Sequence, residues 1–505
     1  MPTSEEQLNA LWGEIQDLQS TQELLGWDQE TYMPGAAHGV RASMCGTVAA
    51  LKHRLLTADA LWHAIEDCAA VAEPGGALEA QARVARREVA RARRVPEALT
   101  RALAEARSRG TAAWQEARKE DDWSLFEPAL DELVRLTREE AAVAEPDLAT
   151  YDALLENWEP GAREDDLVPI FDDLLAELVP LVAAIQESGR TVDESPMAGD
   201  FPEAAQRALA VHAASGLGFD FGAGRLDLAA HPFCVGLAPS DVRMTWRFDA
   251  SDPRPGLFGV LHEAGHGLYE QGLPSPWRGT PLGAAVSLGI HESQSRLVEN
   301  QIGRSLGFWR WLSPTFHAHF PHTASHGAEA LWSTLHVVRP SLIRVDADET
   351  TYNLHVAIRF ELERELFGGG LTVADLPAAW DERYASLLGV RAASAADGAL
   401  QDIHWSQAIF GYFPTYTLGS LNASQLTSAL RRDLGLDGDG DWTAALAAGE
   451  LRPILGWLRD KIHGHGRRYD APELIRRATG RPPSAADLVR DLKRNAETFY
   501  GVGAS

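Results

Sequence analysis

The chain has 505 residues, of which 45% are hydrophobic and 23% are charged. These values are typical of a globular protein with a large apolar core. The formal net charge is −26 at pH 7, and a surface of this sign repels phosphate backbones and anionic lipid headgroups. We therefore expect neither nucleic acid nor a membrane among the partners.

The cysteines and the N-terminal residues indicate the cellular compartment in which the protein is expected. Cys45, Cys68 and Cys234 are few, odd in number and far apart, which does not predict a disulfide framework. The opening Met-Pro-Thr-Ser-Glu-Glu lacks the basic stretch and apolar core of a signal peptide, and no apolar run is long enough to span a bilayer. We expect a cytoplasmic protein.

Helical spacing dominates the first 190 residues. Phe126, Leu130, Leu133 and Val134, for example, recur at helical intervals. Proline and glycine separate one such segment from the next, and a loop is predicted over residues 188–203. The sequence therefore predicts a mainly helical protein.

A strand is predicted over residues 242–248, because apolar side chains alternate there with polar ones. We expect this strand to have an exposed edge that could pair with an extended peptide. A helix should follow and end near Gly272, where glycine is a common stop. After a proline-rich loop, a second helix is predicted from Leu282 to about Leu306.

The first of these two helices contains the pattern H-E-x-x-H, formed by His262, Glu263 and His266. Positions i and i+4 lie on one face of a helix, so the two histidines can bind one metal ion together. Glu263 then lies beside the metal, where it can take a proton from water. The alternative is that both histidines are ordinary core residues.

A catalytic zinc site needs a third protein ligand. No histidine follows His266 at the spacing used by the three-histidine class, so we expect a carboxylate from the next helix. Glu292 is the best candidate, and Glu270 is a weaker alternative. His291 precedes Glu292 directly, and neighbours on a helix diverge by about 100°, so the two cannot easily share a metal.

Several further segments, in order along the chain, resemble the carboxypeptidase Taq family of thermostable metallocarboxypeptidases. The matching segments are Leu24–Pro34, Tyr151–Gly161, His231-Pro-Phe233, Asp241–Thr245, His262–His266, His291–Arg296, Ile343–Asp348 and Gly398–Trp405. This resemblance covers nearly the whole length of the chain.

The resemblance implies a mainly helical fold with a deep active-site groove and a small β-sheet beside the zinc helix, shared in outline with angiotensin-converting enzyme and neurolysin-like oligopeptidases. The chain would be one catalytic unit. Residues 1–190 would wall the groove, and residues 191–505 would form the catalytic part.

The resemblance also implies an activity. The enzyme would release single C-terminal residues from peptides with broad specificity, as a homodimer that uses Zn²⁺, or Co²⁺ as a substitute. By the motif match His262, His266 and Glu292 are the metal ligands, and Glu263 is the general base.

Substrate recognition suggests further candidates. A carboxypeptidase binds a free carboxylate, which arginine does with a bidentate fork. Arg344 is the first candidate, although it could instead pair with Asp346 or Asp348. Arg243 is the second, with a structural role as the alternative.

Aromatic and histidine side chains extend this set. His404, Tyr412 and Tyr416 resemble the transition-state region of neurolysin-like enzymes, and core packing is the alternative for each. His231 could line the groove or serve a turn before Pro232.

The residues that orient the zinc histidines are a separate question. In thermolysin-like sites an Asp one turn after the third ligand does this, but here that position is Arg296. Asp346, Asp348 and Asp402 are the candidates.

Two competing functions remain at this point. One is a zinc oligopeptidase or dipeptidyl-carboxypeptidase with the same metal site. The other is a helical binding or scaffold protein with an inactive site, against which His262, Glu263, His266 and Glu292 are all present.

Overall fold

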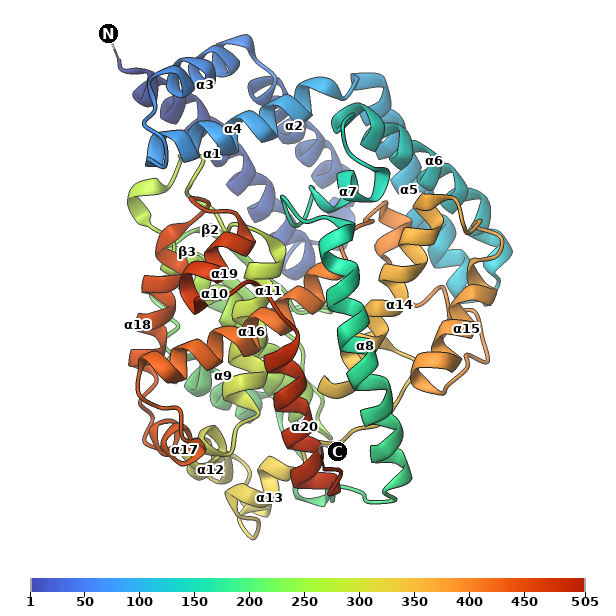
Figure 1. Cartoon of the computed structure of the whole chain (residues 1–505), viewed down its shortest axis with the longest axis vertical. Coiled ribbons are helices and arrows are strands. Elements are labelled where there is room, and N and C mark those ends of the chain that lie inside the picture. The colour runs from blue at the N-terminus through green and yellow to red at the C-terminus, as the bar shows by residue number, and fades with distance from the viewer. Residues whose placement is uncertain (1, 504–505) are drawn as a thin grey trace. The chain divides into compact units, whose positions relative to one another are not determined.

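A computed structural model describes residues 2–503, and most of them lie in helices (Figure 1). The chain divides into two compact units. Unit 1 comprises the chain up to Ala92, Asp193–Leu335 and Asn422–Pro483, and unit 2 comprises Arg93–Val192, His336–Leu421 and the chain from Ser484 onward. The mainly helical fold and the small sheet confirm the predicted fold class. The proposed roles of residues 1–190 and 191–505 stay a prediction.

Unit 1 holds most of the shorter helices and the sheet. Its helices are α1 (Ser4–Thr31), α2 (His38–Leu56), α3 (Asp59–Val71), α4 (Ala77–Arg94), α9 (Glu203–Leu217), α10 (Arg254–Gly272), α11 (Leu288–Arg296), α12 (Leu306–His319), α13 (Ala328–Ser333), α17 (Asp439–Ala447), α18 (Arg452–Lys461) and α19 (Ala471–Thr479). A π-helical segment, η5 (Leu297–Gly303), directly follows α11.

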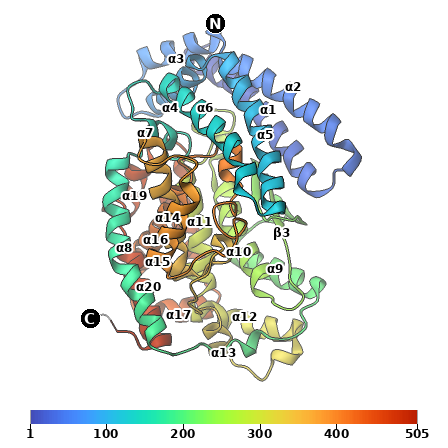
Figure 2. The same cartoon turned by 90° about the vertical axis from the view of Figure 1, so that its right-hand side faces the viewer.

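Unit 2 is built from helices around one apolar core. They are α5 (Glu97–Glu120), α6 (Glu127–Ala144), α7 (Thr150–Leu155), α8 (Glu164–Glu187), α14 (Glu349–Gly368), α15 (Leu376–Leu388) and α20 (Ala486–Tyr500). The pairs α5–α6 and α8–α20 lie side by side (Figures 1 and 2). Helix α16 (Pro414–Asp433) begins in unit 2 and ends in unit 1.

Helix α14 has an unusual buried face. Asp348 caps its N-terminus by accepting hydrogen bonds from the backbone N–H groups of Thr350 and Thr351. Its buried residues include His355, Arg359 and Glu363, which recur every four positions and so share one face. Buried ionisable groups need specific partners, so this stripe points to a polar network inside unit 2.

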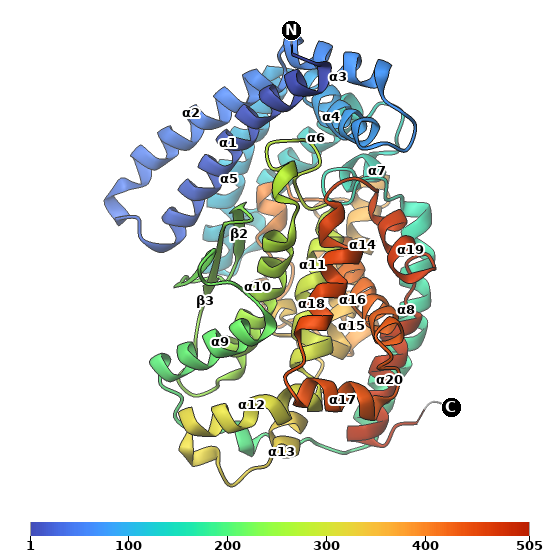
Figure 3. The same ribbon diagram turned by 90° about the vertical axis from the view of Figure 1, so that its left-hand side faces the viewer.

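The sheet of unit 1 lies against α10 (Figure 3). Its order is β1 (Gly224–Leu228), β3 (Asp241–Trp246) and β2 (Cys234–Ala238), with β3 parallel to β1 and antiparallel to β2. The predicted strand at 242–248 is therefore central. The expectation that it offers an exposed edge to a peptide is wrong, because both of its edges are already paired.

The second predicted helix also differs from the structure. It begins at Leu288 rather than Leu282, because the side chain of Ser287 caps it by accepting from the N–H of Ile290 at 3.1 Å. It then widens into η5 and ends at Gly303. π-Helical turns are rare in proteins as a whole, but those that do occur often lie at functional sites.

Helices α10 and α11 cross in close contact at Gly265. A Cβ atom at this position would lie 2.4 Å from the carbonyl oxygen of Gln294 and 2.5 Å from the Cα of Ser295. These are backbone atoms of α11 and cannot rotate away. Gly265 therefore sets how closely the two helices approach, and its neighbour His266 is carried to within reach of α11.

The crossing predicts opposite effects of alanine at two helical glycines. Gly265→Ala should lower the free energy of unfolding by roughly 1–3 kcal/mol, as overpacking does. Gly46→Ala in the middle of α2 is the matched control, because no atom lies within 4 Å of its added Cβ and alanine favours a helix interior by about 1 kcal/mol. Chemical denaturation of both variants checks this. A Gly265→Ala variant as stable as the wild type would contradict it.

Candidate active site

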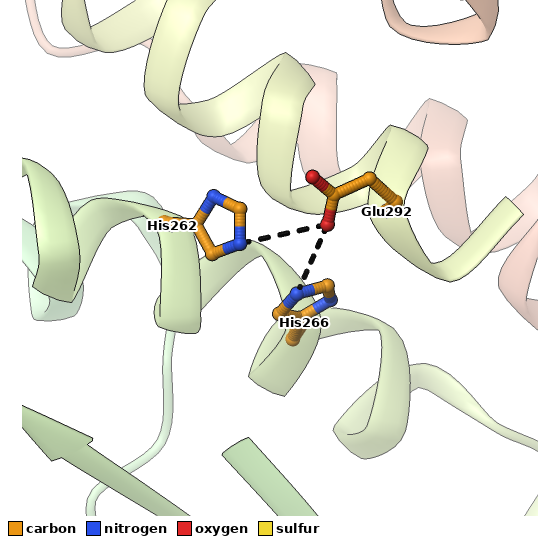
Figure 4. A group of neighbouring side chains, drawn as sticks. All are labelled: His262, His266 and Glu292. Carbon is orange, nitrogen blue, oxygen red and sulfur yellow. Dashed lines mark ion pairs between the residues drawn. The ribbon is translucent and has the colours of Figure 1, made fainter. Parts of the chain in front are cut away.

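Three side chains of unit 1 converge between α10 and α11 (Figure 4). His262 and His266 project from one face of α10, and Glu292 comes from α11. The Nε2 atom of each histidine lies 3.5 Å from Oε2 of Glu292. Each residue offers one ligand atom, and all three atoms lie within 4.8 Å of one another. Within residues 2–503 this is the one set of three such side chains with the spacing of a metal site.

Glu270 and His291 lie next to this set but outside it. Nε2 of His291 is 2.9 Å from Oε1 of Glu270, and Nδ1 of His291 is 2.6 Å from Nδ1 of His266. Glu270 thus contacts His291, which in turn contacts Nδ1 of His266. In this arrangement Glu292, and not Glu270, faces the Nε2 atoms.

The outer nitrogen of each histidine is also engaged. Nδ1 of His262 lies 2.9 Å from Oε2 of Glu299, and Nδ1 of His266 lies 3.1 Å from the backbone oxygen of His291. An Nδ1–H that donates to these oxygens leaves the Nε2 lone pair free to face a cation. Such contacts fix both the tautomer and the ring orientation.

Glu299 was missed in the sequence, and the expectation that Asp346, Asp348 or Asp402 orients these histidines is wrong for His262. Asp348 instead caps α14, and Asp402 pairs with two arginines in unit 2. The spacing could have revealed Glu299, because it follows Glu292 by seven residues, or two helical turns, and so lies on the same face.

Arg296 holds the two carboxylates of this helix in place. Its Nε donates to Oε1 of Glu292 at 2.7 Å, and its Nη1 donates to Oε2 of Glu299 at 3.1 Å. Burial alone would raise the pKa of Glu299, but Arg296 and His262 hold it well below its usual range. Glu299 is therefore ionised, and Oε2 of Glu292 is left facing the histidines.

Glu263 is 6% exposed and lies next to His262 in the sequence. Burial raises the pKa of its carboxyl group to about 7. A carboxyl group with a pKa near neutrality can both accept and release a proton at working pH, as a general base requires. The carboxylates of Glu292 and Glu299 outweigh burial and raise the pKa of His262 to about 9, so this position favours positive charge.

In unit 2, Arg344 is buried and pairs with Asp402. Its Nε and Nη2 donate to Oδ1 of Asp402 at 3.1 and 2.9 Å. The predicted alternative partners, Asp346 and Asp348, do not take this place. Arg359 donates from Nε to the other oxygen of Asp402 at 2.7 Å. Two guanidinium groups therefore share one carboxylate.

This shared carboxylate leaves an excess of positive charge. The remaining acceptors of Arg359 are neutral groups: the backbone oxygen of His355, the hydroxyl of Tyr384 and the side-chain oxygen of Gln401. Burial alone would raise the pKa of Asp402, but the two arginines hold it far below its usual range. Arg344, Arg359 and Asp402 together carry one more positive than negative charge, and such a trio favours an anion.

The predicted aromatic candidates join the same cluster. Nε2 of His404 lies 3.3 Å from the hydroxyl of Tyr416, and the guanidinium of Arg344 lies 5.0 Å from the centre of the Tyr416 ring. The ring of Tyr412 is 5.2 Å from that of Tyr416. Burial lowers the pKa of His404 to about 4, so the imidazole is neutral at pH 7.

Arg243 and His231 belong to neither group. Arg243 forms a bidentate pair with Asp241 and stacks 4.3 Å over the ring of Trp27, so it fastens α1 to the sheet. His231 is exposed in the turn before Pro232, which lies near Gly259 of α10.

The chain is similar to known carboxypeptidases over nearly its whole length. Residues 7–496 match the sequence profile described as carboxypeptidase Taq (M32) metallopeptidase. The chain is 42% identical to thermostable carboxypeptidase 1 of Thermus thermophilus, with 95% of each chain covered, and 34% identical to carboxypeptidase 1 of Bacillus subtilis, with 94% of this chain and 95% of that one covered.

Solved structures of carboxypeptidases also resemble this chain over nearly its whole length. The M32 carboxypeptidase from Deinococcus radiodurans superimposes with a TM-score of 0.94 at 36% identity, covering 99% of this chain and 100% of that chain. A Pyrococcus furiosus carboxypeptidase gives a TM-score of 0.94 at 34% identity, covering 98% and 99%. These matches favour a carboxypeptidase over an oligopeptidase. The chain therefore belongs to the carboxypeptidase Taq (M32) family of metallopeptidases, and it is a metallocarboxypeptidase, which confirms the activity that the sequence predicted.

Proposed function

We propose that His262, His266 and Glu292 hold the divalent metal that this family requires, and that the metal is Zn²⁺, with Co²⁺ as a substitute. The convergence of two Nε2 atoms and one carboxylate oxygen is the observation that supports this. Two histidines and one glutamate are a common ligand set for catalytic zinc, with a further position left open. Because both Nδ1 atoms have partners, the residues present fit such an ion.

We propose that Glu263 is the general base. A bound divalent metal would polarise the scissile carbonyl and lower the pKa of water at the site. Glu263 accepts a proton from that water and later delivers it to the leaving amine. Its buried position and raised pKa suit both steps.

We propose that Arg344 binds the free carboxylate at the end of the peptide. The support is the surplus positive charge of the cluster that Arg344 forms with Asp402 and Arg359. Tyr416 packs against this arginine, and His404 and Tyr412 both lie next to Tyr416. We infer that His404 and Tyr416 donate hydrogen bonds to the oxygen that becomes negative during the reaction, and that Tyr412 contacts the substrate.

Cleavage specificity, oligomeric state and compartment are proposed here by analogy with the family. We propose that single residues are released from the C-terminus with broad specificity, and that the enzyme is a homodimer of a reducing, cytoplasmic compartment. All three cysteines are free, which agrees with such a compartment. Among the described residues, no helix combines the length and apolarity that crossing a bilayer would require.

Replacing the base should separate metal binding from catalysis. Glu263→Gln should retain the metal and lose about 10²–10⁴-fold in kcat, because the amide cannot accept the proton. Metal content by mass spectrometry and kcat on a peptide substrate check this. Unchanged activity would remove Glu263 from its role.

The ligand assignment predicts different outcomes for two glutamates. Glu292→Gln should lose the metal on dialysis, because a carboxylate ligand is replaced by a weaker neutral one. Glu270→Gln is the matched control and should keep the metal, since Glu270 contacts His291 instead. Equilibrium dialysis with Zn²⁺ measures both. Loss of metal from Glu270→Gln with retention in Glu292→Gln would reverse the assignment.

The position of the cut can be tested with matched peptides. A free C-terminus should give a ladder of products shortened one residue at a time, and an amidated C-terminus should give none. Internal cleavage of amidated peptides would refute this function.

The carboxylate-binding role of Arg344 can be tested by substitution. Arg344→Met should raise KM for free peptides about 10–100-fold, because a charge-assisted hydrogen bond to the substrate carboxylate is lost. Asp402 keeps Arg359 as a partner in this variant. Arg243→Met is the control and should leave KM unchanged.

A further inference from the structure

Glu363 is a buried carboxylate whose direct hydrogen-bond partners are all neutral. Its side chain has no exposed surface. The indole N–H of Trp405 donates to Oε1 at 2.9 Å, and the backbone N–H of Gly411 donates to Oε2 at 2.9 Å. The hydroxyl of Tyr151 donates to Oε2 at 3.0 Å. Burying a carboxylate without a direct cation is costly, so a residue of this kind points to a specific role.

The three donors come from separate parts of unit 2. Tyr151 lies on α7, and Glu363 itself lies on α14. Trp405 belongs to a 3₁₀ turn, His404–Gln407, and Gly411 follows shortly after it. The carboxylate thus joins two helices to both ends of the segment 404–411.

That segment is also confined at Gly411. Its φ of 72° is in the left-handed region, and a Cβ atom there would lie 2.8 Å from the backbone carbon of Leu154 in α7. Only glycine suits both conditions. The backbone at 411 therefore lies tightly against α7, and its N–H group is held by Glu363.

The segment carries residues of the proposed reaction. His404 precedes Trp405 directly, and Tyr412 follows Gly411 directly. His404 in turn contacts Tyr416, which lies in the first turn of α16. Fixing the indole of Trp405 and the backbone of Gly411 therefore restrains the residue next to each of the two candidate contacts.

We propose that Glu363 is a positioning residue, which clamps residues 404–411 through three hydrogen bonds so that His404 and Tyr412 are held in their working orientation. This rests on the proposed roles of His404, Tyr412 and Tyr416. Small displacements of positioned groups have large effects on rate, since an error of about 1 Å can cost about 100-fold.

The carboxylate suits this clamp better than its amide. Three N–H or O–H donors converge on two oxygen atoms, and a glutamine would place an NH₂ group where one of these oxygens lies. In either orientation of the amide, one backbone or indole N–H would then face another N–H group. Glu363→Gln therefore loosens the segment without changing the volume of the side chain.

The same variant should not lose stability, because removing a buried ionisable carboxyl group offsets the cost of the mispaired N–H group. Burial raises the pKa of Glu363 to about 7, and the charged or titratable groups that face it are Tyr151 from α7 and Arg359 one turn earlier on α14. A carboxyl whose folded pKa is raised stabilises the fold fully below its unfolded pKa, and this stabilisation is lost as pH rises through about 7. Glutamine does not ionise, so the variant should gain stability relative to the wild type between about pH 4.5 and 7.

The experiment combines local and functional measurements on the metal-loaded full chain. Glu363→Gln should lower kcat/KM roughly 10–100-fold, with a midpoint of denaturation at pH 8 no lower than that of the wild type. Hydrogen–deuterium exchange should become faster in peptides covering 404–416 and stay unchanged in those covering the metal helix, 254–272. Glu361→Gln is the matched control, because Glu361 lies on the same helix and pairs with Arg383 instead.

The outcomes separate this inference from the proposed function. If Glu263→Gln is inactive but Glu363→Gln keeps kcat/KM within twofold, the clamp is wrong and the reaction stands. If hydrogen–deuterium exchange becomes faster throughout unit 2 and the midpoint of denaturation falls, Glu363 has a structural role only and the proposal is wrong. If the variant does not fold, Tyr151→Phe and Trp405→Phe decide, because each removes one donor. Both should lower kcat/KM with faster exchange in 404–416, and wild-type behaviour of both would overturn the proposal.

Discussion

The metal site depends on the close approach of two backbones. Two of its proposed ligands come from α10 and the third from α11, so the separation of these helices sets the distances between ligand atoms. That separation is set at Gly265, where even a methyl group would overlap the backbone of Gln294 and Ser295. The glycine costs the helix about 1 kcal/mol relative to alanine. It is retained because a close crossing needs a position without a side chain, immediately before His266.

Each unit contains a buried cluster in which charged side chains share their partners. In unit 1 the carboxylates of Glu292 and Glu299 share Arg296, and they still raise the pKa of His262 to about 9 despite its burial. This environment favours a cation. In unit 2 Arg344 and Arg359 share Asp402, and this environment favours an anion. The proposed metal ion and the proposed peptide carboxylate have the charges that these two environments favour.

The sequence predicted what local periodicity and fixed spacing determine. The helical character of the chain, the shared face of His262 and His266, and the carboxylate Glu292 on the next helix all follow from residue spacing. The central place of β3 could not be predicted, because its neighbours β1 and β2 are short, with five residues each. Nor could the pairing of Arg344 with Asp402, since 58 residues separate them and closer aspartates offered simpler partners. Glu299 was predictable in principle, because its spacing from Glu292 places both on one helix face.

The buried face of α14 shows how far a single helix can organise a polar interior. His355, Arg359 and Glu363 follow one another at one-turn intervals, and each contacts different segments of unit 2. Arg359 bonds Asp402, the partner of Arg344, and Glu363 bonds the residue after His404 and the residue before Tyr412. A helix is well suited to this, because its own hydrogen bonds are satisfied internally and its side chains are fixed by packing. Apolar residues at these positions would leave Trp405 and Gly411 without Glu363, and they would leave Asp402 with Arg344 but without Arg359.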